Sequence, residues 1–369
     1  MKIGIVFGTR PEIIKLSVLI KLAERAHHVE LETIHTGQHY SYNLSARFLE
    51  DLDLPRISEN IEVGSTERLE QIRKITRDLE PLFSKSKNRP DVVVVQGDTN
   101  SVLAGAIAAR NAGIPCAHVE AGLRCFDPEM IEEINRKETD RICDLRFAVN
   151  AVSVQNLANE GISDGSVMEV GNTIVEVICE NLEISSRRYG VLAELGLEPD
   201  GYVLITIHRK ENVDDEKRLS ALISAWERIE LPMLYTIHPH AMERVVEFEL
   251  LRRLEAIENL KVVEPLSYWD FLELSRNSRM IISDSGGIQE ECTVYKRPVI
   301  VARDSTERPE IIGSFGEIVG NDQERIIAEV ARLDRDFNEI IERLSGLPSP
   351  YGDGKASERI LDALLETYG

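Results

Sequence analysis

The sequence predicts an α/β protein made of two doubly wound, Rossmann-like domains. Short apolar segments alternate with amphipathic helical segments along the chain, a rhythm typical of βαβ units. Several apolar segments have no polar interruption, such as Val92-Val93-Val94-Val95, which indicates strands covered on both faces of a parallel sheet. The segments form two series, separated by a break between Gly171 and Gly201, and a length of 369 residues agrees with two domains.

The individual elements follow from this alternation. In the first series we expect strands at 2–7, 30–35, 91–96, 115–119 and 145–149, with helices at 13–25 and 101–111. In the second series we expect strands at 202–207, 233–237, 260–263, 280–283 and 298–301, with a helix at 219–229. We place the hinge close to Gly171, and a Pro/Gly-rich turn precedes a final amphipathic helix.

The composition excludes several classes of protein. A formal net charge of −21 argues against nonspecific binding to nucleic acid or to anionic membranes. The sequence has no apolar run of about 18 residues that would span a membrane. The first apolar segment is too short for a signal peptide. Five scattered cysteines without a C-x-x-C pair predict neither a zinc site nor a disulfide framework. We expect all five to be small buried residues in a reducing cytoplasm.

Charged residues gather where the strand at 115–119 ends. His118-Val119-Glu120-Ala121-Gly122-Leu123-Arg124 is followed by Glu132-Glu133-Ile134-Asn135-Arg136. Open α/β sheets bind ligands outside the carboxyl ends of their strands, so this cluster predicts a reaction site. Asp98 follows the preceding strand of the series. Either Asp98 or Thr99 caps the next helix, or Asp98 lies with Glu120 in one cleft.

The segment Gly8-Thr9-Arg10-Pro11-Glu12 opens the first helix. Pro11 suits the first helical turn, where its missing N–H has no partner. Arg10 and Lys15 place two cations near the positive end of the helix dipole. A bound anion, most simply a phosphate, would resolve this conflict.

Two strand ends of the second series carry similar signals. His208 precedes two cations and is either a structural residue or an acid or phosphate ligand, with His238 a weaker candidate. Ser285-Gly286-Gly287 opens a helix, where small residues let backbone amides approach a phosphate. The alternative is ordinary capping by Ser285. No G-x-G-x-x-G follows a strand, which disfavours a dinucleotide cofactor.

Nine motifs together resemble one family, the non-hydrolysing UDP-N-acetylglucosamine 2-epimerases. They span residues 8 to 354 in the order of the family: Gly8–Glu12, Gly97–Thr99, His118–Arg124, Glu132–Arg136, Gly171–Thr173, His208-Arg209, Asp284–Glu291, Thr306–Glu310 and Pro350–Gly354.

This resemblance implies a fold of the glycosyltransferase-B type, with two domains facing a cleft. The first domain would comprise residues 1–171, with the helix at 353–369 packing back on it, and residues 172–352 would form the UDP-binding domain. The resemblance also implies a UDP-sugar substrate, no required cofactor or metal, and a homodimer.

The resemblance assigns roles to individual residues. The catalytic candidates are Asp98, Glu120, Glu132 and His208, supported by Arg136. The substrate-binding candidates are Arg10, Lys15, Phe271, Ser285, Gly286, Gly287, Glu291 and Arg308, with Glu291 on the ribose hydroxyls. The possible regulatory residues are Gln38, His39 and His238, of which Gln38 and His39 match the activator site of some relatives.

The chemistry of this reaction agrees with the residues. No carbonyl lies beside the C2 proton of the sugar to acidify it, whereas departure of UDP from C1 does so. Elimination to 2-acetamidoglucal, reprotonation of C2 on the other face and return of UDP give the epimer. Three alternatives remain open at this point: a hydrolysing epimerase, a retaining glycosyltransferase on the same fold and a catalytically silent sugar-nucleotide sensor.

Overall fold

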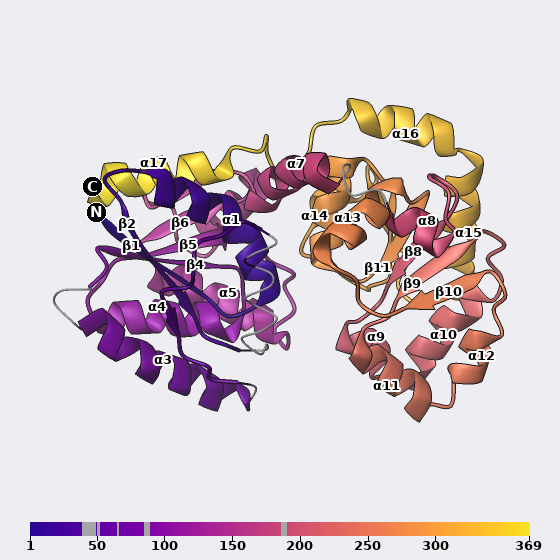
Figure 1. The fold of residues 1–369 in the computed structure, drawn as a ribbon, viewed down its shortest axis with the longest axis horizontal. Helices are drawn as coiled ribbons and strands as arrows, with labels where there is room; N and C mark the ends of the chain where they lie inside the picture. The colour runs from indigo at the N-terminus through magenta and orange to yellow at the C-terminus, as the bar shows by residue number, and fades with distance from the viewer. Residues whose placement is uncertain (39–48, 50–51, 65, 85–88, 186–189) are drawn as a thin grey trace. The chain divides into compact units, whose positions relative to one another are not determined.

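The computed structural model describes residues 1–38, 49, 52–64, 66–84, 89–185 and 190–369. The chain divides into two compact units. The N-terminal unit comprises Met1–Val177 and Tyr351–Gly369, and the C-terminal unit comprises Ile178–Pro350. Each unit has its own parallel sheet (Figure 1), so the predicted α/β class with two Rossmann-like domains is confirmed.

The N-terminal unit contains a seven-stranded sheet in the order β3-β2-β1-β4-β5-β6-β7. Its strands are β1 Lys2–Phe7, β2 Glu30–His35, β3 Glu59–Asn60, β4 Val92–Gln96, β5 Cys116–Ala121, β6 Leu145–Ala148 and β7 Val167–Glu169. Its helices are α1 Arg10–Arg25, α3 Arg68–Ser84, α4 Asn100–Asn111, α5 Ile131–Ile142, α6 Ala151–Asn159, α7 Thr173–Ser185 (continuing into the other unit) and α17 Ala356–Tyr368. The strand order reverses between β1 and β4, which is where doubly wound sheets bind ligands.

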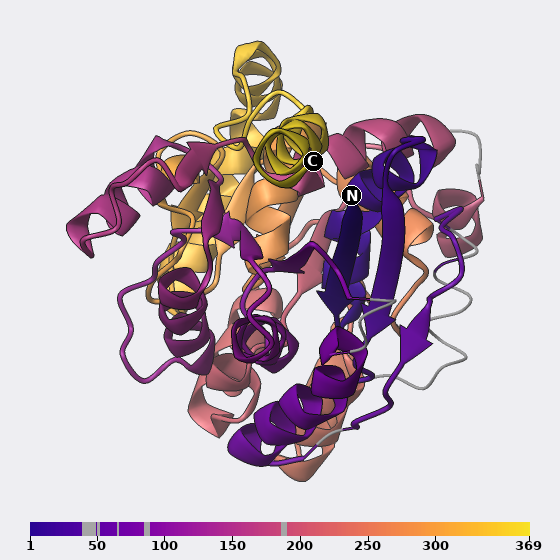
Figure 2. The same ribbon diagram turned by 90° about the vertical axis from the view of Figure 1, so that its left-hand side faces the viewer.

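The core of the N-terminal unit explains its layers. The valines of β4 are fully buried, and Val93 and Val95 pack with apolar side chains of α3 and α4. Helix α17 packs against α1. The first and last described residues lie close together in both views (Figures 1 and 2). The inward face of α17 carries Ile360, Leu361 and Leu364, which are buried. The final residues therefore complete the fold of the first ones.

The C-terminal unit contains a six-stranded parallel sheet in the order β10-β9-β8-β11-β12-β13. Its strands are β8 Val203–Thr206, β9 Met233–Thr236, β10 Leu260–Val263, β11 Met280–Ser283, β12 Val299–Val301 and β13 Gly316–Ile318. Its helices are α8 Val191–Leu195, α9 Lys210–Val213, α10 Glu216–Trp226, α11 Pro239–Glu247, α12 Leu251–Glu255, α13 Tyr268–Asn277, α14 Gly286–Tyr295, the 3₁₀ turn η1 Pro309–Ile311, α15 Gln323–Arg335 and α16 Phe337–Gly346. Here the order reverses between β8 and β11.

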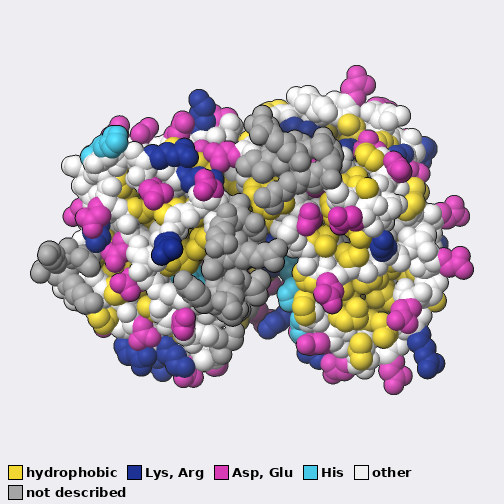
Figure 3. All heavy atoms as spheres, in the orientation of Figure 1, with side chains coloured by type: hydrophobic (Ala, Val, Ile, Leu, Met, Phe, Trp, Pro, Cys, Tyr) yellow, Lys and Arg dark blue, Asp and Glu magenta, His cyan; other side chains and the backbone are white. Residues whose placement is uncertain are grey.

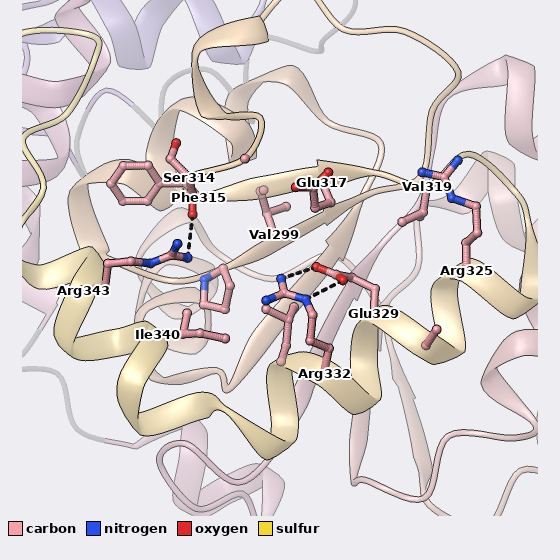
Figure 4. A pocket seen from close by; sticks show the side chains of 15 residues that line it. Val299, Ser314, Phe315, Glu317, Val319, Arg325, Glu329, Arg332, Ile340 and Arg343 are labelled. Atoms are coloured by element: carbon pink, nitrogen blue, oxygen red, sulfur yellow. Dashed lines mark hydrogen bonds and ion pairs between the residues drawn. The ribbon is translucent and has the colours of Figure 1, made fainter.

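A cavity of about 420 Å³ lies at the edge of the C-terminal sheet, beside β13 (Figure 4). Arg325 and Arg343 line it, and their guanidinium groups donate to the carbonyl oxygens of Ile318 and Ser314. Both arginines come from helices that follow β13, Arg325 from α15 and Arg343 from α16. Their bonds to the backbone carbonyls of Ile318 and Ser314 give these two arginines a structural use at the sheet edge.

The ten expected strands are all present, with bounds that differ by at most a few residues. Three short strands, β3, β7 and β13, were not expected. Their residues are largely half-buried or exposed, so they lack the continuous apolar run that marks a central strand. The expectation of five buried cysteines is wrong for Cys179, which is exposed, and for Cys125, which is half-buried.

The surface and the helices agree with the net charge and with the absence of a long apolar run in the sequence. Figure 3 shows acidic side chains spread over the visible face of both units, as the net charge of −21 requires. Within the described ranges, every helix is too short or too polar to cross a bilayer.

Candidate active site

Glu120 ends β5 in an unusual backbone conformation. Its φ is 71°, in the left-handed region that side chains rarely adopt, and the strand register shifts at this residue. Its carboxylate, 5% exposed, accepts from Lys15 Nζ at 2.5 Å, Asn172 Nδ2 at 2.8 Å and Gln96 Nε2 at 2.5 Å. Such strain persists only where the surroundings impose it, and it is found most often at functional sites. Glu120 is therefore a carboxylate held in a fixed position.

Lys15 has a different partner from the one its sequence position suggests. The sequence places it near the start of α1 with a bound anion to balance its charge. In the structure its buried ammonium group balances Glu120 instead. Arg10 stands at the first residue of α1 and is half-buried.

Asp98 follows β4, next to Glu120. Gly97 joins the two strand ends, because its N–H donates to the carbonyl oxygen of Val119 at 3.0 Å. The helix cap of α4 is Thr99, which confirms the capping alternative for Thr99 and leaves Asp98 outside the cap. Arg136 Nη2 lies 2.5 Å from the Asp98 carboxylate, which is 30% exposed. The structure thus brings Asp98, Glu120 and Arg136 to one edge of the N-terminal sheet.

The neighbours Glu132 and Glu133 in the first turn of α5 differ sharply. Glu133 is 1% exposed and accepts from the backbone N–H of Cys125 at 3.0 Å and from Arg136 at 3.2 Å. Glu132 is exposed. Glu133 thus holds the loop before α5 in place, and Glu132 is the member of the pair that is accessible to a substrate.

Glu12 binds the turn between β1 and α1. Its buried carboxylate accepts from the N–H groups of Gly8 at 2.9 Å and Thr9 at 2.6 Å and from the Thr99 hydroxyl at 2.8 Å. Burial raises the pKa of Glu12 to about 7, although these hydrogen bonds act against the rise. Glu12 therefore ties the ends of β1 and β4 together beside Asp98.

A network of buried charges lies beneath the strand ends. His118 on β5 faces Asp140 on α5, with Nδ1 and Oδ1 2.6 Å apart. Asp140 also accepts from Arg124 at 2.7 Å, and Arg124 forms two hydrogen bonds of 2.8 Å with Glu160. Arg146 on β6 donates to the Asp140 carbonyl oxygen at 2.5 Å. This network fixes α5, the helix that carries Glu132 and Arg136, to β5.

In the C-terminal unit, Asp284 organises the end of β8. It is fully buried and accepts from the backbone N–H groups of His208 at 3.1 Å and Arg209 at 2.9 Å. Asn212 Nδ2 donates to it at 3.0 Å. The ring nitrogen Nδ1 of His208 lies 3.2 Å from the same carboxylate, and 41% of the His208 side chain is exposed. Asp284 therefore orients His208 with its ring accessible from outside.

The start of α14 is formed by three small residues, Ser285, Gly286 and Gly287. Ser285 occupies the N-cap position, but its side chain makes no capping hydrogen bond, so the capping alternative is wrong for that side chain. A Cβ on Gly286 would come 2.7 Å from Glu307 Oε1, so a larger residue does not fit without a shift. Helix N-termini of this kind attract phosphate groups.

The remaining binding candidates of this unit are dispersed around α14. Arg308 is buried in ion pairs with Glu290 at 2.5 Å and Glu307 at 3.1 Å. Glu291 is half-buried, with its carboxylate near Gly287. Phe271 is half-buried on α13. Through its ion pair with Glu290, Arg308 thus holds α14 in place and adds a positive charge beside this helix.

The regulatory candidates have different surroundings. Gln38 is 4% exposed, and its Oε1 accepts from the N–H of Ser101 at 3.0 Å and from the Ser101 hydroxyl at 2.6 Å. His39 lies outside the described residues. His238 is exposed and caps α11, with Nδ1 accepting from the N–H of His240 at 3.2 Å.

The sequence reasoning missed the neutral amides around Glu120, namely Gln96 and Asn172. Both stand directly at motif positions, but an amide carries no charge to attract notice. Only their contacts show a role. Among the residues described, no group of three or more acidic, histidine or cysteine side chains is arranged to hold a metal ion.

Comparison with known proteins identifies the family. The family model described as UDP-N-acetylglucosamine 2-epimerase matches residues 21–365. The UDP-N-acetylglucosamine 2-epimerase of Methanocaldococcus jannaschii is 42% identical over the full length of both chains. The UDP-2,3-diacetamido-2,3-dideoxy-D-glucuronate 2-epimerase of Pseudomonas aeruginosa is 32% identical, over 99% of this chain and 100% of the relative.

The folds agree equally well. The crystal structure of the Methanocaldococcus jannaschii enzyme in complex with UDP-GlcNAc and UDP matches with a TM-score of 0.88 over 100% of both chains. The resemblance inferred from the nine motifs is confirmed over the whole chain. The protein is therefore a member of the UDP-N-acetylglucosamine 2-epimerase family.

Proposed function

We propose that this chain interconverts UDP-N-acetylglucosamine and UDP-N-acetylmannosamine by inverting C2 of the sugar, through elimination of UDP and its return to 2-acetamidoglucal. The observation that carries this proposal is the Asp98–Glu120 pair of carboxylates at adjacent strand ends, each with a cationic partner. The reaction needs acid–base groups at C2, which are typically worth about 10² to 10⁴-fold in rate.

The two units supply different chemistry in this proposal. In the N-terminal unit, Asp98, Glu120 and Glu132 move the C2 proton, and Arg136 supports them. In the C-terminal unit, the start of α14 and His208 bind and stabilise the diphosphate as it leaves C1. Glu291 accepts the ribose hydroxyls. Arg10, Lys15, Phe271 and Arg308 complete the substrate-binding set.

The proposed enzyme needs no nicotinamide or metal, because the electrons of the C2–H bond stay within the sugar during elimination. It acts as a homodimer in the cytoplasm. The family resemblance supports both statements, and light scattering of the purified chain tests the dimer. A monomer that epimerises at full rate would remove the dimer from the proposal and leave the reaction in it.

One incubation tests the function. The chain is mixed with UDP-N-acetylglucosamine in D₂O, without metal or nicotinamide, and the products are followed by NMR. We expect deuterium at C2 of UDP-N-acetylmannosamine. Free N-acetylmannosamine with UDP would show the hydrolysing reaction instead. Absence of C2 exchange would refute both, and the diacetamido uronate analogue would then be offered as substrate.

A further inference from the structure

We propose that His118 is held as a buried imidazolium and acts as a positioning residue for Asp98. The effect on catalysis rests on the proposed function. The charge of His118 is inferred from hydrogen-bond geometry alone. His118 is fully buried in β5, one strand position away from Val119 and two from Glu120. In this role His118 does not contact the substrate.

Both ring nitrogens of His118 face acceptors. Nδ1 lies 2.6 Å from Asp140 Oδ1, and Nε2 lies 2.8 Å from the carbonyl oxygen of Gly97. A carbonyl oxygen never donates. A neutral imidazole has one N–H and one lone pair, so it would turn a lone pair toward one of these oxygens. Only the doubly protonated ring satisfies both contacts.

Asp140 is not the source of the missing proton. It also accepts from Arg124 at 2.7 Å and from the N–H of Gly122 at 3.2 Å. Burial opposes the ionisation of Asp140, whereas the charge and the hydrogen bond of Arg124 favour it whatever the state of His118. Asp140 is thus an ionised acceptor.

Four side chains are joined by direct hydrogen bonds: His118, Asp140, Arg124 and Glu160. A further buried cation, Arg146 from the neighbouring strand β6, binds the Asp140 carbonyl oxygen and the Ser166 hydroxyl. The charge of His118 is therefore assigned from the two acceptors of its ring and not from a count of the surrounding charges.

The N–H at Nε2 of His118 fixes the orientation of the peptide group before Asp98. That peptide joins Gly97 to Asp98, and its carbonyl oxygen is the acceptor of His118. Gly97 adopts a φ of 89°, which glycine tolerates and other residues rarely do. Its N–H is bound by Val119, so β5 holds this turn at both ends. His118 therefore determines the direction in which Asp98 leaves β4, toward Arg136.

Two substitutions separate the roles of the ring nitrogens. His118→Gln keeps a donor near the position of Nε2, and His118→Asn keeps one near Nδ1. We expect His118→Asn to lower kcat by about 10²-fold, the usual effect of a displacement of about 1 Å at a reacting group. His118→Gln should recover at least about tenfold of this loss. KM and UDP affinity should stay within about twofold, because the proposed phosphate site is in the other unit. Equal kcat for the two variants, or kcat near the parent value for His118→Asn, would refute the positioning role.

The charge is measured on the parent protein. Long-range ¹H–¹⁵N NMR of imidazole-labelled full-length chain, between about pH 7 and 8, should give two protonated nitrogens for His118. The resonances are assigned by their loss in His118→Gln. One protonated and one unprotonated nitrogen would overturn the inference even if epimerisation is complete. A doubly protonated ring in a chain that exchanges no C2 proton would instead refute only the proposed reaction.

Discussion

Three hydrogen-bond donors surround the carboxylate of Glu120, and this arrangement shows what single residues decide. Lysine and two amides hold it, while its backbone stays in a conformation that glycine normally occupies. Natural sequences keep such local conflicts mainly where function requires them. The neighbouring Asp98 is held by Arg136 and is partly exposed. The two carboxylates thus differ in their exposure to solvent.

Conversion of either carboxylate to its amide tests the assignment. Asp98→Asn and Glu120→Gln should each lower C2 exchange by at least about 10²-fold, because an amide neither accepts nor returns the proton. Exchange is read by NMR in D₂O. UDP binding, measured by calorimetry, should change little. Full turnover by one variant would remove that residue from the catalytic set.

Glu132 and Glu133 form a matched pair for a second test. Glu132→Gln should lower the rate while the free energy of unfolding changes by less than about 0.5 kcal/mol, because the residue is exposed. Glu133→Gln should lower stability by roughly 3 kcal/mol, because it neutralises the more deeply buried of the two carboxylates that pair with Arg136. Urea unfolding and the exchange assay measure the two effects. The reverse pattern would exchange their roles.

At the scale of elements, helix α5 connects stability with the site. It carries Glu132 and Arg136 near its start and Asp140 near its end, and Asp140 joins it to β5 through His118. Helix α14 has the corresponding place in the C-terminal unit, with its N-terminus open and its body fixed by Arg308. In both units a helix is positioned by buried ion pairs that lie away from the exposed groups.

The pKa of Asp140 predicts how α5 responds to acid. Because the folded-state pKa lies below the ordinary value of 3.8, its contribution to stability is present above that value. The contribution is lost as pH falls through the folded-state pKa. Asp140→Asn should therefore destabilise the chain by about 3 to 5 kcal/mol near pH 7. Below about pH 4 the difference in urea midpoint should shrink. A difference that stays constant from about pH 7 to pH 3 would contradict this account.

The start of α14 is tested by adding one methyl group. Gly286→Ala places a Cβ against Glu307, 2.7 Å from its Oε1, and should weaken UDP binding by about tenfold, equivalent to 1.4 kcal/mol. Gly165→Ala is the control, since a Cβ there meets nothing within 4 Å. Calorimetric titration with UDP compares them. Unchanged affinity in Gly286→Ala would argue against phosphate binding at this helix.

At the scale of the whole molecule, the chain returns to its first unit at its end. Helix α17 packs on α1 and buries Ile360, Leu361 and Leu364, although more than 150 residues of the C-terminal unit intervene in sequence (Ile178–Pro350). The N-terminal unit therefore depends on residues that follow the whole C-terminal unit in the sequence. Each unit otherwise has its own sheet and core.

Removal of residues 356–369 tests this dependence. The three large apolar side chains bury enough surface for about 5 kcal/mol, so the N-terminal unit should unfold at lower temperature or aggregate. The C-terminal unit should keep its UDP affinity, because its core does not use α17. Scanning calorimetry with and without UDP separates the two effects. An unchanged thermal profile would show that α17 is dispensable.

The sequence by itself determined the α/β class, the two series of strands, ten of the strands and the family. Continuous valine runs and charged residues at strand ends are local patterns. They depend on neighbouring residues in the sequence, so the sequence alone shows them. The same information gave Asp98 and Glu120 as neighbours, because successive parallel strands end at the same sheet edge.

Tertiary structure alone decided which charged residues support the site and which remain accessible. The family resemblance names Glu132 as the catalytic candidate, but residue chemistry alone does not show that Glu133 is the buried member of the pair. Nor does the sequence pair Lys15 with Glu120 across 105 positions. Those pairings arise when distant strands and helices pack and leave each buried charge near a particular partner. The partner sets the energetic cost of a buried charge, and only the folded chain brings the partners together.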